Sequence, residues 1–408
     1  MPNADNWQRD VLRDLRSTPQ PPQAPPQPQQ QPERPGTQPQ PQTHPQERPG
    51  TPARTPPHPR SPGQAPAPST SAAAAPATPW PAQRAVAPPA ATPPARTRRP
   101  APSPDSRPVV DGALAGTARR PLRGEPAAVR VARAIRRIVS SSAAREVTEL
   151  TRTAECIQQP VTTGRQISVT SIRGGAGKTT VAALLGTAYA HHRQDPVLLV
   201  EADPALGSLP LRLGAEALRW TTADLADIVE PQMSLLDVTG YLVQLPDNAW
   251  LLPGSQGRIG AMLDTSAYER VMVALRRYFG VTVVDCETLP AEVARVALSA
   301  SQARVLAAPA TLDGITSTYA VLQWMQGLPR HMIAGTVVAL TSMTARPGID
   351  VEAAAEKLRS TGAAVHVLPY DRHLAAGGTL RTELLARPTR LAATGLAAEV
   401  FQLSQKRR

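Results

Sequence analysis

The chain has 408 residues and a formal net charge of +12, and 33 of its 46 prolines lie before residue 127. Roughly two-thirds of the chain is therefore left to form a hydrophobic core, which is enough for one large domain. The two cysteines are far apart and lack metal-ligand spacing, which argues against a disulfide framework and a zinc site. No apolar run reaches the roughly eighteen residues of a membrane helix and the N-terminus is polar, which argues against a membrane span and a signal peptide. We therefore expect a cytoplasmic protein.

The first predicted element is a short amphipathic helix within residues 1–18. Residues 4–15 place Trp7, Val11, Leu12 and Leu15 on one helical face. A single helix of this length is marginal in water. The segment is therefore either a docking helix or a transient helix at a frayed terminus.

Residues 19–126 are predicted to be a disordered, partly polyproline linker. They are rich in Pro, Gln, Ala, Thr and Arg, and they bury too little apolar surface to offset the entropy of ordering. Residues 16–126 hold 13 arginines against five acidic residues, so most of the excess charge lies here. Such a tail is drawn to DNA, anionic lipid or an acidic partner alike. On this interpretation, removing residues 1–126 leaves the stability of the rest unchanged.

Residues 127–160 are predicted to be a helical extension, with helices at about 128–139 and 143–157. The first helix has an apolar stripe and a basic stripe, formed respectively by Val131, Ala132, Ile135, Ile138 and Val139, and by Arg130, Arg133, Arg136 and Arg137. We expect the apolar stripe to pack on the following domain while the arginines face solvent. Contact with a membrane or a nucleic acid is the alternative.

Residues 161–408 are predicted to form one α/β domain, a doubly wound and mostly parallel sheet. Short β-branched runs alternate there with Ala- and Leu-rich helical stretches, which is typical of a parallel sheet with helices on both faces. The predicted strands are Ile167–Ser171, Val197–Val200, Val281–Val284, Val305–Ala308, Val337–Leu340 and Val365–Leu368.

A phosphate-binding loop follows the first of these strands and opens a helix at Thr179. Its predicted nucleotide ligands are Gly174, Gly175, Ala176, Gly177, Lys178, Thr179 and Thr180. Glycines let backbone amides turn towards phosphates, Lys178 reaches the terminal phosphates and the Thr179 hydroxyl ligates Mg²⁺. Lys178 is one of only three lysines among 44 basic residues, which indicates that the site requires an ammonium group.

The loop resembles the variant P-loop of the MinD/ParA family, Lys-Gly-Gly-x-Gly-Lys-Thr-Thr, with Arg173 at the first lysine. The resemblance implies a P-loop NTPase fold, ATP and Mg²⁺ as cofactors, slow hydrolysis and an ATP-dependent homodimer. In the family the first lysine reaches the phosphates of the partner subunit, so Arg173 is the candidate for that catalytic contact, alongside Lys178.

Two carboxylates complete the predicted site. Residues 201–207, Glu-Ala-Asp-Pro-Ala-Leu-Gly, resemble the family's Asp-x-Asp-Pro-x-x-Gly, so Asp203 inherits the role of positioning the attacking water, and Glu201 replaces the first Asp. Asp285 ends a strand that looks like a Walker B strand and is, with Thr179, the predicted metal ligand. The family follows this Asp with small residues, Pro and Gly, whereas this chain has Cys286-Glu287-Thr288.

Two further segments resemble the EspI-like ATPases of actinobacteria, namely residues 307–314 and residues 367–378, which include Pro369-Tyr370-Asp371. These ATPases are a MinD-like subgroup that is found with type VII secretion systems and carries Pro-rich N-terminal regions. A secretion-system component is therefore the expected protein partner. Three alternatives stay open: a partition ATPase that binds DNA, a nucleotide-binding scaffold with little turnover, and membrane targeting through the final helix, about Leu391–Leu403. The family's adenine-reading Asn is replaced by Thr341-Ser342-Met343, so the sequence shows no contact that reads the base.

Overall fold

In a computed structural model of the chain, the described residues are 103–117, 121–139, 143–205, 207–258 and 260–406. The chain divides into two units, residues 1–93 and 94–408, and all described residues belong to the second. The helix predicted within residues 1–18, and the predicted linker as far as residue 102, lie outside the described residues.

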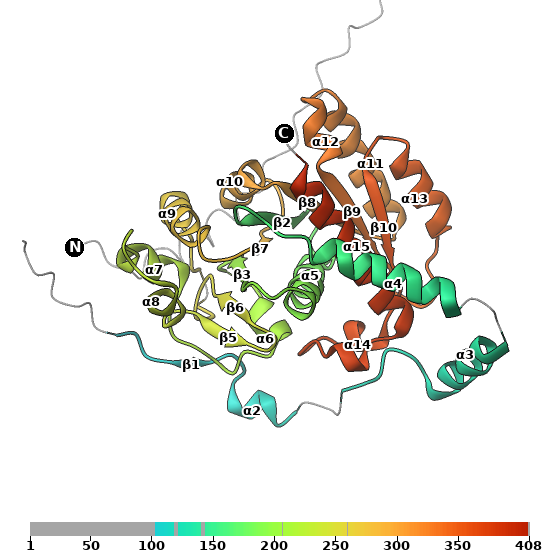
Figure 1. Cartoon of the computed structure of the whole chain (residues 1–408), viewed down its shortest axis with the longest axis horizontal. Coiled ribbons are helices and arrows are strands. Elements are labelled where there is room, and N and C mark those ends of the chain that lie inside the picture. The colour runs from blue at the N-terminus through green and yellow to red at the C-terminus, as the bar shows by residue number, and fades with distance from the viewer. Residues whose placement is uncertain (1–102, 118–120, 140–142, 206, 259, 407–408) are drawn as a thin grey trace, which may run out of the picture. The chain divides into compact units, whose positions relative to one another are not determined.

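An eight-stranded sheet forms the centre of the second unit (Figure 1). Its strand order is β10-β9-β8-β2-β7-β3-β6-β5, and all neighbours are parallel except β5 and β6. The strands are β2 (Arg165–Ser171), β3 (Val197–Ala202), β5 (Val243–Leu245), β6 (Ala249–Leu252), β7 (Val281–Cys286), β8 (Ala303–Pro309), β9 (Thr336–Thr341) and β10 (Ala364–Leu368). The doubly wound, mostly parallel α/β fold is therefore confirmed.

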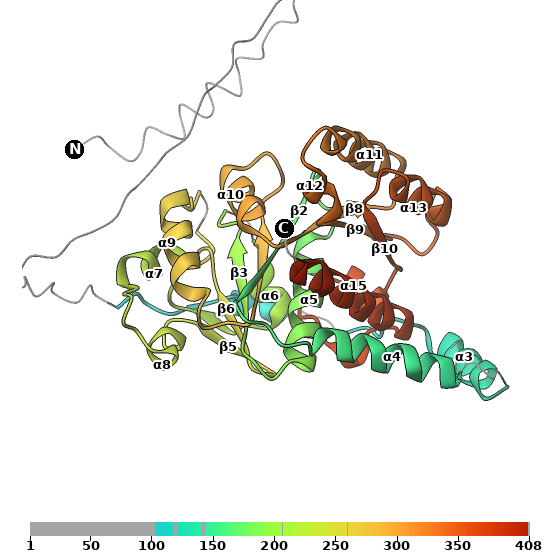
Figure 2. The same cartoon turned by 45° about the horizontal axis from the view of Figure 1, so that its top comes forward.

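Helices cover both faces of this sheet (Figures 1 and 2). One face packs against α4 (Ala143–Ile157), α5 (Lys178–His192) and α15 (Arg387–Gln405), and the other against α9 (Thr265–Leu275), α10 (Glu292–Ala300), α11 (Leu312–Gln326) and α13 (Val351–Arg359). Shorter helices are α6 (Leu209–Leu213), α7 (Thr222–Ile228), α8 (Leu235–Thr239), α12 (Arg330–Ala334), α14 (Arg372–Ala375) and the 3-10 turn η1 (Thr382–Leu384).

The alternation of side chains along β2 shows why this strand is central. Ile167 and Val169 are fully buried in the core under α5 and α15. Gln166 and Ser168 point to the other face, where both donate hydrogen bonds to the carbonyl of Ala297 in α10. β2 lies between two parallel neighbours, β8 and β7, and the strand order reverses beside it. In such sheets the carboxyl ends of the strands at the reversal, and the loops after them, are where ligands bind.

The six predicted strands each lie inside an observed strand, and β5 and β6 were absent from the predicted set. These two form an antiparallel hairpin whose turn residues, Asp247 and Asn248, both have positive φ, 57° and 58°. Two consecutive left-handed residues are typical of a tight hairpin turn. The strands themselves are too short to produce a clear alternating pattern.

Two helices occupy the extension before the domain, α3 (Ala127–Val139) and α4, close to the predicted ranges. The packing expected for α3 is wrong where its side chains are described. Val131 and Ile135 are each 59% exposed, and Ala132 is exposed as well. By contrast α4 packs along α15, where Cys156 and Ile157 are buried.

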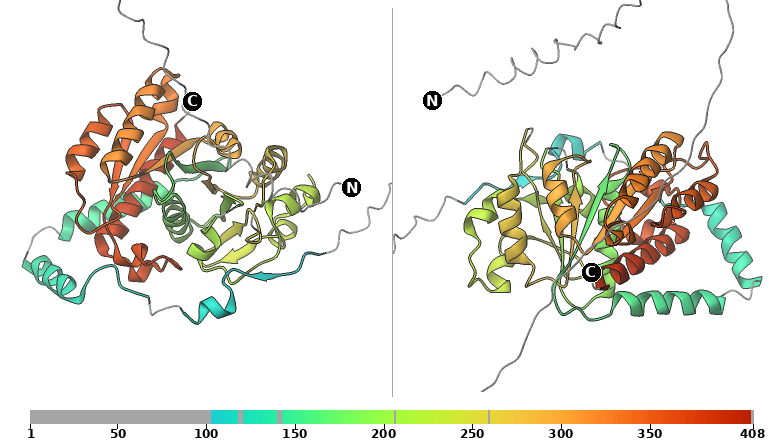
Figure 3. Two further views of the ribbon diagram at one scale, coloured as in Figure 1. Left: turned by 180° about the vertical axis from the view of Figure 1, so that it is seen from behind. Right: turned by 90° about the horizontal axis from the view of Figure 1, so that it is seen from above.

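The end of the predicted linker is also ordered, contrary to expectation. β1 (Arg107–Pro108) pairs antiparallel with β4 (Ala217–Leu218), the amide of Val109 donates to Glu216 O, and α2 (Gly112–Ala115) follows. Figure 3 shows this cyan segment running along one edge of the domain. Strand addition relies on backbone hydrogen bonds, so the low aliphatic content of the linker gave no sign of it.

Gly124 fixes the next part of this segment, here called the strap (residues 103–117 and 121–126). Its amide donates to Leu384 O at 2.8 Å, and its carbonyl accepts from the amide of Arg372 at 3.2 Å. A Cβ at this position would lie 2.4 Å from the Ala386 amide nitrogen and 2.5 Å from the carboxylate of Asp371. Only glycine fits so close to this loop.

The strap predicts different outcomes for two truncations. Deleting residues 1–102 should leave the melting temperature unchanged, whereas deleting residues 1–126 should lower it by roughly 5 °C or more, because several backbone hydrogen bonds to the domain are lost. Differential scanning calorimetry of the two truncated proteins and the full chain is the measurement. Equal melting temperatures for both truncations would show that the strap contributes nothing to stability.

The final helix packs into the core instead of presenting an apolar face. Leu396, Ala397 and Val400 of α15 are fully buried, and Leu403 packs against the same cluster. The face proposed for membrane targeting is therefore occupied by the domain itself. Among the described residues, no helix combines the length and apolar character needed to cross a bilayer.

Candidate functional site

The loop between β2 and α5 has the geometry of a phosphate cradle. Gly175 and Gly177 have φ of 75° and 84°, in the left-handed region that favours glycine. A Cβ at Gly174 or Gly175 would meet nothing within 4 Å, so there is open space beside both glycines. Ala176 is buried, and its carbonyl accepts a hydrogen bond from Thr341 Oγ1 at 3.0 Å. The loop is therefore anchored to β9 at one point and open where phosphates would bind.

Lys178, the first residue of α5, is held beside this open side. Its Nζ donates to Thr288 Oγ1 at 3.2 Å. Thr288 is placed by its neighbours, because Thr170 Oγ1 donates to Glu287 O and the Leu289 amide donates to Ser171 O. The ammonium thus donates to a neutral hydroxyl, and a phosphate oxygen could replace this hydroxyl as the acceptor at little cost in free energy.

Asp285 ends β7 next to the loop and is fully buried. Neither carboxylate oxygen makes a hydrogen bond of ideal geometry within the described part of the chain, although the Thr179 hydroxyl lies close enough to interact with the carboxylate. Burial raises the pKa of Asp285 to about 7, against the lowering effect of the Thr179 hydroxyl and Lys178. A buried carboxylate beside a hydroxyl on the first turn of α5 fits the ligand set of a magnesium ion that also contacts phosphates.

Asp203 lies in the loop after β3, the strand that pairs with β7. Its charge raises the pKa of Glu287 and of Asp285, after the larger effect of burial on each, so the three carboxylates share one region. Glu201 pairs directly with Asp285 across the two strands, yet it is only 2% exposed and burial raises its pKa to about 8. The structure thus brings Asp203, Asp285 and Lys178 close together, and their catalytic roles remain predictions.

Arg173 contacts its own subunit. Its Nε donates to Ser317 Oγ at 2.9 Å and lies 3.7 Å from Asp313 Oδ2, both on α11. The Arg173 and Asp313 side chains are 51% and 62% exposed, so this ion pair contributes little to stability and is easily exchanged for another partner. An exposed guanidinium at the rim of the loop can exchange this contact for another one.

A cavity of about 210 Å³ adjoins the other side of the P-loop. It is lined by Gly177 and Thr180 of the loop and helix, by Met343, and by Pro369 and Tyr370 after β10. The loop after β10 is held by the buried Asp371, whose carboxylate accepts from the amides of His373 and Ala386. An apolar and aromatic pocket beside a phosphate cradle suits the base of a nucleotide.

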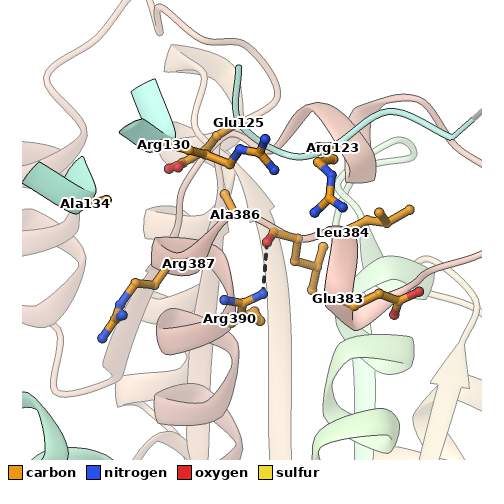
Figure 4. A pocket seen from close by; sticks show the side chains of 10 residues that line it. Arg123, Glu125, Arg130, Ala134, Glu383, Leu384, Ala386, Arg387 and Arg390 are labelled. Carbon is orange, nitrogen blue, oxygen red and sulfur yellow. Dashed lines mark hydrogen bonds between the residues drawn. The ribbon is translucent and has the colours of Figure 1, made fainter. Parts of the chain in front are cut away.

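A second cavity, of about 270 Å³, lies between the strap, α3 and the start of α15 (Figure 4). Arginines 123, 130, 387 and 390 line it together with Glu125 and Glu383, and Arg390 donates to Leu385 O. It contains none of the predicted site residues. The four arginines outnumber the two carboxylates, but the described contacts point to no particular ligand, so we assign none.

Three contributors to the site were not predicted. Thr288 holds Lys178, Thr341 anchors the P-loop, and Tyr370 lines the adjoining cavity. Thr288 and Thr341 lie at positions where the sequence differs from the family pattern. Those differences drew attention to both residues but did not indicate that they contact Lys178 and the P-loop. Such roles depend on which loops meet at the sheet edge, which local patterns do not encode.

Comparison with known proteins places this geometry in context. Residues 167–375, about half of the chain, match the family described as the CobQ/CobB/MinD/ParA nucleotide binding domain. The chain is 28% identical over 229 residues to the ESX-1 secretion-associated protein EspI of Mycobacterium tuberculosis, a match that covers 54% of this chain and 34% of that protein. It is 34% identical over 122 residues to the septum site-determining protein MinD of Synechocystis, covering 30% of this chain and 44% of MinD.

These matches span less than half of the length of the two relatives. Among solved structures, a complex of ATP with a substituted form of McdA from Cyanothece aligns with a TM-score of 0.45 and 20% identity, over 60% of this chain and 98% of that one.

Proposed function

We infer the function from the premise that this chain belongs to the CobQ/CobB/MinD/ParA nucleotide-binding family. We propose that it is an ATPase that binds Mg-ATP at the P-loop, dimerises around the nucleotide, hydrolyses it slowly and thereby positions or regulates a partner. The observation that carries this proposal is the buried Asp285 close to the Thr179 hydroxyl and the Lys178 ammonium, beside a loop whose glycines Gly175 and Gly177 have positive φ.

The chemistry would be in-line attack of water on the terminal phosphate. The loop amides of residues 174–180 and the ammonium of Lys178 would stabilise the charge that develops on the phosphate oxygens. Asp203 would orient the attacking water. Thr179 and Asp285 would hold Mg²⁺, which when bound neutralises phosphate charge.

Dimerisation would complete the site. Arg173 would leave the weak contact with Asp313 and reach the phosphates bound by the partner subunit, where its planar fork suits phosphate oxygens. The base would occupy the cavity beside Met343 and Tyr370, whose size suits a purine, and the choice of ATP rests on membership of the family.

The partner we favour is a protein component of a type VII secretion system. The match with EspI supports this choice, as does the resemblance of residues 367–378 to the EspI-like subgroup. The exposed Val131 and Ile135 of α3 add apolar surface to a helix that carries four arginines and no acidic residue. Such a helix suits contact with an acidic partner.

The same helix favours one rival function, a partition ATPase that binds DNA without sequence preference. In that case ATP would be required for retention on DNA, and retention would fall steeply with salt.

Phosphate release by the full chain tests both proposed functions. We expect slow, Mg²⁺-dependent release that EDTA abolishes and that the protein partner accelerates. Acceleration by DNA together with salt-sensitive DNA retention would favour partition, and no release under any condition would contradict the ATPase proposal.

A further inference from the structure

Glu201 stands where the MinD/ParA pattern has its first aspartate, and its side chain is used differently from what that position suggests. The carboxylate is almost completely buried. Oε1 accepts a hydrogen bond from the amide of Leu209 at 3.2 Å, and Oε2 accepts one from the amide of Gly254 at 3.1 Å. Each oxygen is thus bound to the backbone of a different segment, α6 on one side and the end of β6 on the other.

The segment between these contacts is the loop that carries Asp203. The amide of Gly207 donates to Asp203 O at 3.0 Å, and Ser255 Oγ donates to Pro204 O at 2.6 Å. The loop is therefore closed on itself at one point and attached to the chain after β6 at another. Glu201 is the side chain that joins all three segments.

Two glycines show how tightly this arrangement is built. A Cβ at Gly207 would lie 2.3 Å from Glu201 Oε1 and 2.4 Å from Asp203 O. A Cβ at Gly254 would lie 2.7 Å from Glu201 O. Gly207 faces the side chain of Glu201 and Gly254 faces its backbone carbonyl, and neither position has room for a side chain. The segments around Gly207 and Gly254 therefore pack closely against Glu201.

The length of the Glu201 side chain also matters for the contacts with both amides. An aspartate is one methylene shorter, so its carboxylate would not span both amides from the end of β3. A glutamine keeps the length, but its NH₂ group is a donor and would face one of the two backbone N–H groups. An ionised glutamate supplies two acceptors at this reach, and the amides of Gly254 and Leu209 favour that ionised form against the effect of burial.

We propose that Glu201 is a positioning residue that holds the Asp203 loop in its working geometry by bridging Leu209 and Gly254. This inference rests on the proposed ATPase function for its catalytic consequence. It also assigns the metal-binding carboxylate to Asp285 alone, since Glu201 is engaged by backbone amides.

The test uses the full chain with two substitutions that disturb the bridge from opposite sides, Glu201→Gln and Gly207→Ala. Gly348→Ala is the matched control, because a Cβ there would meet nothing within 4 Å. Hydrogen exchange reads the bridge directly: we expect the amides of Gly207, Leu209 and Gly254 to exchange faster in both variants than in the control. Unchanged exchange in both variants would overturn the proposal.

Turnover then separates the bridge from a general structural role. We expect kcat for ATP hydrolysis to fall about tenfold in both variants while the Kd for ATP changes by less than about twofold, because the phosphate-binding loop is untouched. Unchanged kcat, or equal losses in kcat and ATP affinity, would contradict a positioning role. If the wild-type chain releases no phosphate while exchange still rises in both variants, the ATPase proposal fails and the bridge stands.

Discussion

Replacing Lys178 with alanine is expected to weaken ATP binding by about 100-fold while the melting temperature stays the same. The ammonium donates a hydrogen bond to the Thr288 hydroxyl and no apolar core contact depends on it, and Asp285, which loses the nearby positive charge, can take up a proton because burial already raises its pKa to about 7. In the nucleotide complex it would form charge-assisted hydrogen bonds with the terminal phosphates. Isothermal titration with a non-hydrolysable ATP analogue measures the affinity.

Lys357→Ala is the matched control for this prediction. Lys357 is exposed on α13 and its ammonium lies over the ring of Tyr319, so its loss should not affect nucleotide binding. If Lys178→Ala bound ATP as tightly as the wild type and the control, the P-loop would not be the nucleotide site.

Replacing Asp203 with alanine is expected to slow phosphate release by roughly 100-fold while ATP affinity remains within about threefold of wild type. Asp203 lies in the group of carboxylates at the end of β3 and β7, where it would orient water without binding the phosphates. The variant should accumulate as an ATP-bound dimer, because hydrolysis normally resets that state. Phosphate release and nucleotide affinity are measured in parallel.

Asp227→Ala, on the exposed side of α7, serves as the control for Asp203→Ala. A wild-type rate of phosphate release in Asp203→Ala would remove the proposed catalytic role. A proportional loss of ATP affinity would instead make Asp203 a binding residue.

The fold and the centre of the site could be predicted because their signals are local. Strands buried on both faces, such as the one containing Ile167 and Val169, appear in the sequence as continuous β-branched runs. The P-loop is recognisable because glycines, Lys178 and Thr179 must follow each other at fixed spacing between a strand and a helix. The structure places both features where the sequence predicts them.

The remaining features could not be predicted because they depend on partners distant in sequence. β1 is ordered through the backbone of residues 216–218, and Gly124 through residues 372–386. The amphipathic pattern of α3 predicts an apolar face but not what covers it, and Val131 and Ile135 are exposed. In the sequence Glu201 appears only as a replacement of the family's first Asp, and the positions of Leu209 and Gly254 are needed to show its bridging contacts.

ATP, and not ADP, is expected to join two copies of this chain. Light scattering of the full chain with ATP, with ADP and without nucleotide measures the mass directly, with Asp203→Ala included to trap the ATP state and Arg173→Ala to break the contact across the dimer. We predict a doubled mass for wild type and Asp203→Ala in ATP only, and a monomer for Arg173→Ala under all conditions. A wild-type protein and an Asp203→Ala variant that both remain monomeric in ATP would contradict the switch and favour a passive nucleotide-binding scaffold.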